Sequence, residues 1–548
     1  LYATPDNFLR ELLDSILAQT YTNFEVCLAD GSENGKDKEE FVKKYIEEKN
    51  TGSKIKYNKL GKNLGIAGNT NEALKMASGD YIVLADHDDV ITENALYECA
   101  KAINEENCDC LYSDEDKLDM DGGSLFDPHF KPDFNIDLLE SVNYICHLFV
   151  VKKELVDVAG MFDAAFDGAQ DYDFIFRVTE NAKRIVHIPK VLYHWRCHMN
   201  STASNPQSKL YAFEAGARAI KAHIERVGKS LPVEKIDKGV DYGIYHKYFI
   251  MEDKPLLSII IPNKDHREDL DLAIRSIMTK SSYKNIEFIV VENNSTDKKT
   301  FDYYDKIQKE FDNVKVVRWE REFNYSLINN FGVNFANGEY LFFLNNDIEL
   351  INPTSIEEMM WYAVREDVGI VGARLLYNDD TIQHAGVVIG FGGVAGHTFI
   401  GLSEVENSYF HRALTLQDYS AVTAAALITK KSVFEEVGGF SEDLAVAFND
   451  IDFCMKVRAK NYLVVYNPYA LFYHYESKSR GLEDSPEKIE RFNRETATFM
   501  KRWPKILAKG DPYYNPNLTL RKSNFALRDL LNEKIGEPFI DEKIKKFL

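Results

Sequence analysis

The sequence contains the same series of short motifs twice, in the same order. Residues 78–88, Ser-Gly-Asp-Tyr-Ile-Val-Leu-Ala-Asp-His-Asp, match residues 337–347, Asn-Gly-Glu-Tyr-Leu-Phe-Phe-Leu-Asn-Asn-Asp. Upstream of these, residues 25–32 match residues 287–295. Repetition in a fixed order indicates that one structural unit is encoded twice. We therefore expect two copies of one fold rather than a single large domain.

Two further matches lie downstream of the first pair. Asp171 corresponds to Asp450, and His194 corresponds to His474. Four blocks that keep their order, with slowly drifting offsets, do not arise by chance. The repeat therefore extends over most of both halves of the chain.

The second copy alternates short apolar segments with helical segments. We expect strands at Leu256–Ile261, Ile286–Val291 and Tyr340–Leu344, and a helix at Glu268–Thr279. Such alternation is typical of an α/β fold with a mainly parallel sheet that helices cover on both faces. The first copy has no counterpart of the strand at Leu256–Ile261, so we expect its domain to lack the N-terminal strand.

These features define the expected domain organisation of the 548-residue chain. The chain starts with Leu1 rather than Met, and its first segment is an expected helix, so we expect the sequence to be part of a longer protein. We expect a first domain over residues 1–230, a linker over 231–254, a second domain over 255–510 and a short helical C-terminal tail over 511–548.

Composition excludes several classes of function. Acidic residues outnumber basic ones by 87 to 66, for a net charge of −21, so the overall electric field repels nucleic acids and anionic membranes. No apolar run approaches the length of about 18 residues that spans a membrane. We therefore expect no nucleic-acid partner and at most peripheral membrane association. The seven cysteines are too few and too irregularly spaced for a disulfide framework or a four-ligand zinc site, which favours a reducing compartment.

Acidic motifs follow two of the expected strands in the first copy. Asp30 comes after one strand, and Asp86 and Asp88 come after another. Ligands on open α/β sheets bind beyond the carboxyl ends of strands, and carboxylates there suit Mg²⁺ or Mn²⁺ together with substrate phosphates. In the second copy Asn345 replaces the first carboxylate and Asp347 keeps the last. Capping of the next helix is the alternative role for any single one of these acids.

A second acidic element begins an expected helix in each copy, at Asp171 and Asp450. A carboxylate at a helix N-terminus is stabilised as an anion and can act as a general base beside a substrate hydroxyl. Helix capping is again the alternative. His194 and His474 follow these acids closely and are candidates for a third metal ligand or for phosphate binding, although a lone histidine is more often structural.

Both copies resemble the family 2 glycosyltransferases, whose catalytic domain has the GT-A fold, a Rossmann-like nucleotide-binding sheet. The resemblance covers roughly residues 1–225 and 255–505. It implies two tandem GT-A domains. Its motifs are Asp30–Ser32 with the variant Asn293–Ser295, Asp86–Asp88 with the variant Asn345–Asp347, and the acids Asp171 and Asp450.

The resemblance implies a role for each matched residue. Asp171 and Asp450 would deprotonate the acceptor hydroxyl in an inverting displacement. Nucleotide contacts would come from Asp30, Ser32, Asn293, Ser295, Asp86 and Asn345. A divalent cation, Mg²⁺ or Mn²⁺, would be held by Asp86, Asp88, Asp347, His194 and His474.

The implied substrates are a nucleotide-sugar donor, UDP- or dTDP-linked, and an oligosaccharide or lipid-linked glycan acceptor. The implied setting is the synthesis of bacterial O-antigen, capsule or cell-wall polysaccharide in the cytoplasm, at the inner face of the plasma membrane. Two active sites making successive linkages are the leading hypothesis. The alternatives are one catalytic domain with an acceptor-binding scaffold, or a non-catalytic carbohydrate-binding protein. A nucleotide-dependent oxidoreductase is disfavoured because Ile261–Asp265 is not a glycine-rich turn.

Overall fold

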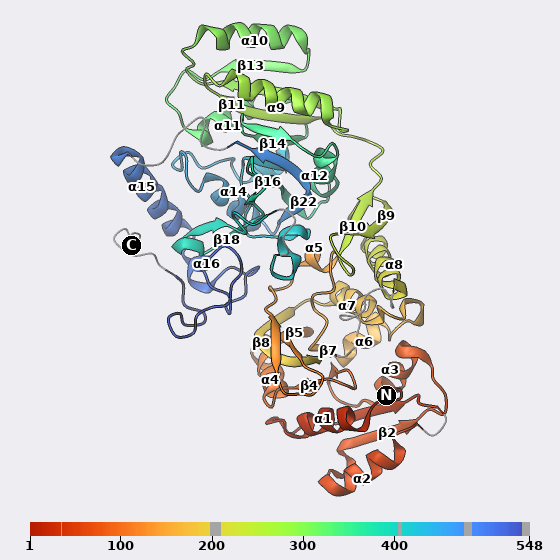
Figure 1. Cartoon of the computed structure of the whole chain (residues 1–548). Helices are drawn as coiled ribbons and strands as arrows, with labels where there is room; N and C mark the ends of the chain where they lie inside the picture. Colours follow the sequence, from red (N-terminus) through yellow and green to blue (C-terminus); the bar gives the residue numbers. More distant parts are fainter. Residues whose placement is uncertain (34–35, 198–209, 404–407, 476–484, 540–548) are drawn as a thin grey trace. The chain divides into compact units, whose positions relative to one another are not determined.

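The computed structural model of the chain describes residues 1–33, 36–197, 210–403, 408–475 and 485–539. The chain forms two compact units, and Figure 1 labels many of their elements. Unit 1 consists of Leu1–Phe134, Val142–Gly228 and Lys235–Lys247, and unit 2 consists of Asn135–Ser141, Lys229–Glu234 and Tyr248–Leu548.

The main sheet of unit 2 has a parallel half and a mixed half. The parallel half, in the order β13-β12-β11-β14, consists of β11 (Leu257–Asn263), β12 (Ile286–Glu292), β13 (Val314–Arg318) and β14 (Tyr340–Leu344). The order then continues through β21 (Ala426–Lys430), β16 (Val368–Leu376), β22 (Leu463–His474) and β15 (Ile348–Leu350). The strands that the sequence predicted in this copy are thus confirmed.

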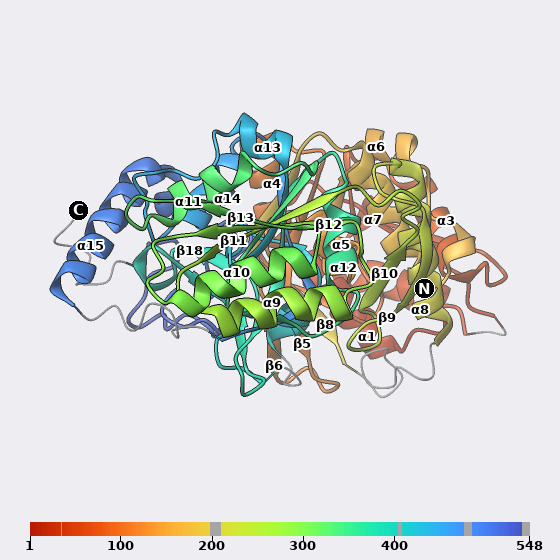
Figure 2. The ribbon, with the colours of Figure 1, turned by 90° about the horizontal axis from the view of Figure 1, so that it is seen from above.

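Helices cover both faces of the parallel half. Helices α9 (Arg267–Lys280) and α10 (Lys298–Glu310) lie side by side on one face (Figure 2). Right-handed crossovers require this, because the chain moves outward from β11 to β12 and then to β13. Helix α11 (Tyr325–Val333) returns the chain to β14 and packs on β11 and β12. Burial on both faces explains why every residue of β14 is apolar and buried.

The remaining elements of unit 2 surround the mixed half of its sheet. Its helices are α5 (Ile136–Leu139), α12 (Ser355–Ala363), α13 (Lys431–Glu436), α14 (Asn449–Arg458), α15 (Pro486–Arg502) and α16 (Pro504–Lys509). Its short strands are β17 (Ile382–His384), β18 (Val387–Ile389), β19 (Ala395–His397) and β20 (Gln417–Asp418).

Unit 1 repeats this plan in two sheets. One sheet contains β1 (Val26–Asp30) and β2 (Ile55–Lys59), paired in parallel. The other has the order β3-β7-β5-β8-β4, with β6 on β5. Its strands are β3 (Tyr81–Leu84), β4 (Val90–Ile91), β5 (Cys110–Leu118), β6 (Leu125–His129), β7 (Phe149–Lys152) and β8 (Ile185–Arg196).

The two sheets of unit 1 are separate because the described residues contain no strand in the place of β11. At that place Leu1 pairs with β1: its amino group donates to the Ala29 carbonyl at 2.6 Å and its carbonyl accepts from the Gly31 N–H at 3.0 Å. Asn263, the last residue of β11, accepts from the Asn293 N–H in the same way, at 2.9 Å. The predicted lack of an N-terminal strand in this domain is confirmed.

The helices of unit 1 include the one that the sequence predicted near Pro5. They are α1 (Asp6–Leu17), α2 (Glu39–Lys49), α3 (Gly65–Met76), α4 (Ala95–Glu106), α6 (Lys153–Ala159), α7 (Gln170–Asn181) and α8 (Leu210–Val227). A hairpin of β9 (Val233–Lys238) and β10 (Tyr245–Phe249) follows α8, where the sequence analysis placed a linker. In the part of the chain that the structure describes, no helix combines the length and the apolar character needed to cross a bilayer.

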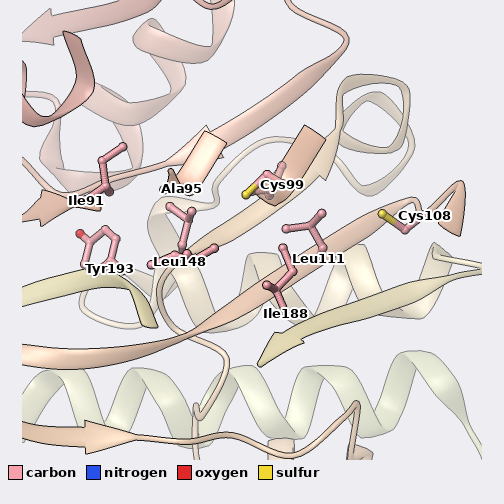
Figure 3. Packing of buried hydrophobic residues seen from close by; sticks show 10 residues of the cluster. Ile91, Ala95, Cys99, Cys108, Leu111, Leu148, Ile188 and Tyr193 are labelled. Atoms are coloured by element: carbon pink, nitrogen blue, oxygen red, sulfur yellow. The ribbon is translucent and has the colours of Figure 1, made fainter. Parts of the chain in front are cut away.

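A hydrophobic core joins α4 to β5 and β8 in unit 1. Figure 3 shows Cys99 of α4, Leu111 of β5 and Ile188 of β8 packed together. The cluster extends to Leu148 and to the ring of Tyr193. Burial raises the pKa of the Cys99 thiol to about 12, so this cysteine acts as a small apolar core residue. The core thereby fixes Tyr193, whose hydroxyl reaches the candidate site described below.

A short segment of the first copy, Asn135–Ser141, belongs to the fold of unit 2. The Arg365 guanidinium contacts Asp137 Oδ1 at 2.6 Å, and both side chains are almost fully buried. Asn135 donates to the Asp418 carbonyl at 2.9 Å. Burial and the charge of Asp137 raise the pKa of Asp418 well above its usual range. This buried charge network holds α5 within unit 2.

The residues that follow α16 form an irregular segment rather than a further helix, as far as residue 539. Asp511 anchors its start: its carboxylate accepts from the Ile389 N–H and from the Ser420 hydroxyl, each at 2.7 Å. Further along, the Phe399 N–H donates to the Ser523 carbonyl at 2.7 Å. The helical part of the C-terminal region is therefore α15 and α16. Residues 540–548 of the predicted tail lie outside the described residues.

Replacement of Asp137 by alanine tests the attachment of this segment to unit 2. We expect Asp137→Ala to lower the free energy of unfolding by about 3 kcal/mol, because it leaves the Arg365 guanidinium buried with one ion-pair partner fewer. Urea unfolding followed by circular dichroism measures the change. Asp157→Ala, at an exposed position of α6, is the matched control and should shift the transition by less than about 0.5 kcal/mol. Equal effects of the two substitutions would contradict the assignment.

Candidate active sites

The acidic motif of unit 1 lies in the loop after β3, at the carboxyl end of that strand. Asp86 is exposed, with 60% of its side chain accessible, whereas Asp89 is fully buried. Asp89 Oδ1 accepts from the Arg196 N–H at 2.7 Å and Oδ2 from the Tyr193 hydroxyl at 2.5 Å. Burial, followed by the charge of Asp86, raises the pKa of Asp89 to about 7. The loop therefore concentrates negative charge at the end of the sheet.

His147, from the segment that precedes β7, joins this acidic loop. Its Nε2 lies 3.6 Å from Asp86 Oδ2. The ligand atoms of Asp86, Asp89 and His147 all lie within 4.8 Å of one another, the arrangement needed for a shared metal ion. Burial opposes protonation of His147, but the charges of Asp86 and Asp89 outweigh it and raise the pKa of the imidazole.

Asp171, the expected base of unit 1, lies in the first turn of α7. Its Oδ2 accepts from the Asn143 side-chain amide at 3.1 Å. Burial raises the pKa of Asp171, and the charge of Asp86 adds to the effect while that of His147 opposes it. The structure thus brings the expected base into electrostatic contact with the acidic loop. The next acid of the motif, Asp173, is fully buried and bound by Arg177 Nε at 2.8 Å, a structural role.

Two predicted metal ligands of unit 1 are not members of this group. His194 lies on β8, opposite Val90, and its Nδ1 is 2.5 Å from Asp116 Oδ1. Asp88 lies in the turn after β3, where its backbone carbonyl accepts from Arg196 Nε at 2.7 Å. Parallel pairing of β5 with β8 puts His194 opposite Asp116, which is its partner instead of Asp86.

The carboxylate of Asp30 is fully buried at the end of β1. It accepts from the Ser32 N–H at 2.9 Å, from the Lys38 N–H at 2.7 Å and from the Tyr57 hydroxyl at 2.9 Å. Burial opposes ionisation, but these hydrogen bonds outweigh it and lower the pKa of Asp30. Asp30 thus shapes the loop that follows β1. Ser32 belongs to the same loop, and its Oγ accepts from the Ala3 N–H at 2.8 Å.

In unit 2 the equivalent of Asp30 is Glu292 rather than Asn293. Glu292 ends β12 as Asp30 ends β1, and each faces the last residue of the neighbouring parallel strand. Glu292 also accepts from the Ser295 N–H, at 2.5 Å, as Asp30 does from Ser32. Asn293 instead donates to the Arg321 carbonyl at 3.1 Å. The loop in unit 2 is one residue longer, which shifts the sequence match by one position.

In unit 2 the structure brings together three residues that the sequence predicted at one site, Asn345, Asp347 and His474. His474 Nε2 lies 3.2 Å from Asp347 Oδ1 and 3.1 Å from Asn345 Nδ2. His474 Nδ1 lies 2.6 Å from Gln383 Oε1, an acceptor that places the proton on Nδ1 and leaves the lone pair on Nε2. Asp347 and His474 are both buried. The end of β22 therefore places His474 beside the loop after β14.

Asp450, the expected base of unit 2, occupies the first turn of α14. Its Oδ2 accepts from the Ala424 N–H at 3.2 Å, and its Oδ1 accepts from the Ile451 N–H at 2.8 Å. Asp452, the second acid of that motif, is buried against Arg502 and Trp503. As in unit 1, the second acid holds the fold, while Asp450 binds the N–H of Ala424, whose neighbour Ala425 accepts from the Asn345 N–H at 3.0 Å.

Four further residues contribute to the sites, although the motifs did not single them out: Asp89, His147, Glu292 and Gln383. Asp89 directly follows Asp86 and Asp88, so its position in the motif was visible. His147 occurs in the first copy only, in an apolar segment that reads as core, so no repeat signal reveals it. The arrangement offers each unit one carboxylate base and, close by, oxygen and nitrogen donors for a hard cation.

Two curated relatives align with nearly the whole chain. An uncharacterized protein, y4gI, of Sinorhizobium fredii is 42% identical over 96% of this chain and 58% of its own length. The O-antigen biosynthesis protein RfbC of Myxococcus xanthus is 34% identical over 95% of this chain and 40% of its own length. The chain thus spans about half the length of these relatives.

Among solved structures, the chain is similar to the mannosyltransferase PcManGT from Pyrobaculum calidifontis in complex with GDP-Man and Mn²⁺. The two sequences are 15% identical, and the TM-score is 0.36. The match covers 56% of this chain and 76% of that chain. Similarity at this level adds nothing on the chemistry of the site.

A family model matches one segment in each copy of the repeat. The model is that of glycosyl transferase family 2, and it matches residues 4–157 and 258–427. The matched segments cover more than half of the chain and include both acidic loops that follow β3 and β14. The chain therefore belongs to glycosyl transferase family 2.

Proposed function

We propose that both units are active sites that transfer sugars from nucleotide-sugar donors to a growing glycan, with inversion at the anomeric carbon. The observation that carries this proposal is the repetition of one constellation. Asp171 in unit 1 and Asp450 in unit 2 each begin a helix beside an acidic or amide-bearing loop at the end of a central strand. A unit that served as a scaffold alone would have no chemical need for both parts.

The donor would bind along the carboxyl ends of the parallel strands, as ligands do on open α/β sheets. In unit 1 the nucleotide would lie against the loop of Asp30 and Ser32. In unit 2 it would lie against the loop from Glu292 to Ser295, which contains Asn293. Asp86 and Asn345 would contribute at the ends of the next strands. A UDP- or dTDP-linked sugar suits these loops, which differ in length between the units.

The oxygen and nitrogen atoms that each unit offers as ligands suit a divalent cation, Mg²⁺ or Mn²⁺. In unit 2, Asp347 and His474 would hold it, because Gln383 fixes the tautomer of His474 with the Nε2 lone pair facing the site. In unit 1, Asp86 would be a ligand. When bound, the cation would offset the negative charge of the donor diphosphate.

The reaction needs one base in each unit. The acceptor hydroxyl gives its proton to the carboxylate of Asp171 or Asp450 while its oxygen attacks the anomeric carbon. The new oxygen–carbon bond forms as the bond between that carbon and the donor phosphate breaks, and the nucleoside diphosphate leaves. A single displacement inverts the configuration, and the sequence and structure suggest no second nucleophile.

The product would be a bacterial surface polysaccharide made from an oligosaccharide or lipid-linked acceptor, at the cytoplasmic face of the membrane. The likeness to the O-antigen biosynthesis protein RfbC supports this setting. A second candidate is a protein with one catalytic unit and one acceptor-binding unit. Asn345 favours it, since an amide in unit 2 replaces the carboxylate that Asp86 supplies in unit 1.

Single substitutions of the two bases separate these candidates. We expect Asp171→Asn and Asp450→Asn each to abolish a different transfer product and to lower its rate by about 10²- to 10⁴-fold, the usual contribution of a general base. The measurement is release of nucleoside diphosphate, with products separated by mass, from a panel of nucleotide sugars with Mn²⁺ and a glycan acceptor. Asp173→Asn and Asp452→Asn serve as neighbouring controls for loss of fold. If Asp450→Asn leaves every product unchanged, unit 2 is a scaffold.

The pH profile of unit 1 gives a second test. Because burial raises the pKa of Asp171, its carboxylate takes up a proton at a higher pH than an ordinary aspartate. In the Asp450→Asn variant we therefore expect activity to fall on acidification with a midpoint above that of an ordinary aspartate, which is about pH 4. The rate of product formation between pH 4 and pH 8 measures this midpoint. If activity instead falls with a midpoint at the ordinary pKa of an aspartate, the base of unit 1 is not a carboxyl group whose pKa is raised by burial.

A further inference from the structure

We infer that the cation site of unit 1 is built from Asp86, Asp89 and His147, with a ring nitrogen of His147 as its nitrogen ligand. This inference rests on the proposed function, since the cation is the one that would accompany the donor diphosphate. It differs from the sequence-based expectation, in which Asp88 and His194 completed the site with Asp86. It also means that the two units take their histidine from different places in the fold, the segment before β7 in unit 1 and the end of β22 in unit 2.

The imidazole of His147 is held in place by contacts that leave one of its two nitrogens unsatisfied within the described residues. The residue is 9% exposed, and among the described residues no side chain or backbone group satisfies its buried Nδ1. Its Nε2 is 3.6 Å from Asp86 Oδ2, beyond hydrogen-bond range. Stacking on Tyr193, with ring centroids 4.7 Å apart, fixes the plane of the ring. An immobilised ring with an unsatisfied Nδ1, and with its Nε2 near the Asp86 carboxylate, can serve as a metal ligand.

The backbone of His147 is clamped by a buried ion pair. Lys131 is fully buried, and its Nζ donates to the carbonyls of His147 at 2.5 Å and Ile145 at 2.8 Å while it contacts Glu115 Oε2 at 3.0 Å. The same Glu115 oxygen accepts from the His147 N–H at 3.3 Å. Both peptide groups around His147 are therefore fixed by charged partners, which positions the ring without using its nitrogens.

One tyrosine ties the three members of the group together. The Tyr193 hydroxyl accepts from the Asp86 N–H at 3.1 Å and donates to Asp89 Oδ2 at 2.5 Å, while its ring stacks on His147. The Arg196 N–H fixes the other oxygen of Asp89. Each carboxylate oxygen has a second lone pair, so these bonds leave Asp89 able to serve as a ligand. Carboxylate oxygens with one imidazole nitrogen suit Mn²⁺ and related divalent cations.

The equivalent positions in unit 2 show that each unit has one histidine available. By strand register Lys152 of β7 corresponds to Lys430 of β21, since they face Tyr81 and Tyr340 respectively. The equivalent of His147 is therefore Ala425, which has no ligand atom. Unit 2 uses His474 at the end of β22, whereas in unit 1 the matching His194 is bound to Asp116.

Manganese binding by the full chain tests the assignment. We expect wild type to bind two Mn²⁺ ions, measured by titration with the electron paramagnetic resonance signal of free Mn²⁺. His147→Phe keeps a ring to stack on Tyr193 but removes both nitrogens. It should lower the Mn²⁺ affinity of one of the two sites by about tenfold or more. Loss of a residue that only hydrogen-bonds to a metal ligand already has an effect of this size. His194→Phe is the matched control and should leave both sites unchanged.

A direct readout of nitrogen ligation keeps the test independent of folding and of turnover. In the His474→Phe variant, pulsed electron paramagnetic resonance of bound Mn²⁺ should still show coupling to a ligand nitrogen, and the added His147→Phe change should remove it. The assignment is overturned if His194→Phe, and not His147→Phe, weakens a site, or if wild type binds no Mn²⁺ in unit 1. Sugar transfer that persists in that last case would leave the proposed function standing while this assignment fails.

Discussion

The buried carboxylates at the ends of the central strands are the constraint on which both units depend. A carboxylate removed from water must be paired or hydrogen-bonded, or it is too costly to keep ionised. Asp30 meets this requirement with two backbone amides and the Tyr57 hydroxyl. Asp347 meets it with His474. The loops that would receive a donor are therefore fixed by their own acids, and the site exists as a consequence of satisfying them.

The two copies of the fold place different side chains beside these acids. Unit 1 concentrates charge, with Asp86 beside Asp89, and brings His147 to it from the segment before β7. Unit 2 replaces the first acid with Asn345 and brings His474 from the end of β22. The two sites thus present different charge to a donor while keeping the base at the same helix terminus.

Sequence reasoning predicted the elements that carry a strong local signal. β14 matches the predicted Tyr340–Leu344, and β12 extends the predicted Ile286–Val291 by a single residue. These strands are runs of apolar residues between polar turns, and burial on both faces demands that pattern. The acids Asp171 and Asp450 lie in the first turn of a helix, as expected, because a repeated motif marks positions that the fold uses twice. Asn293 was misaligned with Asp30, since a one-residue insertion is invisible until strand register is known.

The sequence by itself determined that this chain is a duplicated α/β protein of glycosyl transferase family 2, with an acidic motif after a strand and an aspartate at the start of a helix in each half. Periodicity and repetition are local properties of the chain, so they could be read directly. Only the tertiary structure decided which histidine joins each acidic loop and that residues 135–141 pack within unit 2. Those outcomes depend on contacts between residues far apart in the sequence, such as Asp86 with His147 and Asp137 with Arg365. Side-chain pairing of that kind is fixed by the packing of strands and helices, which no single segment encodes.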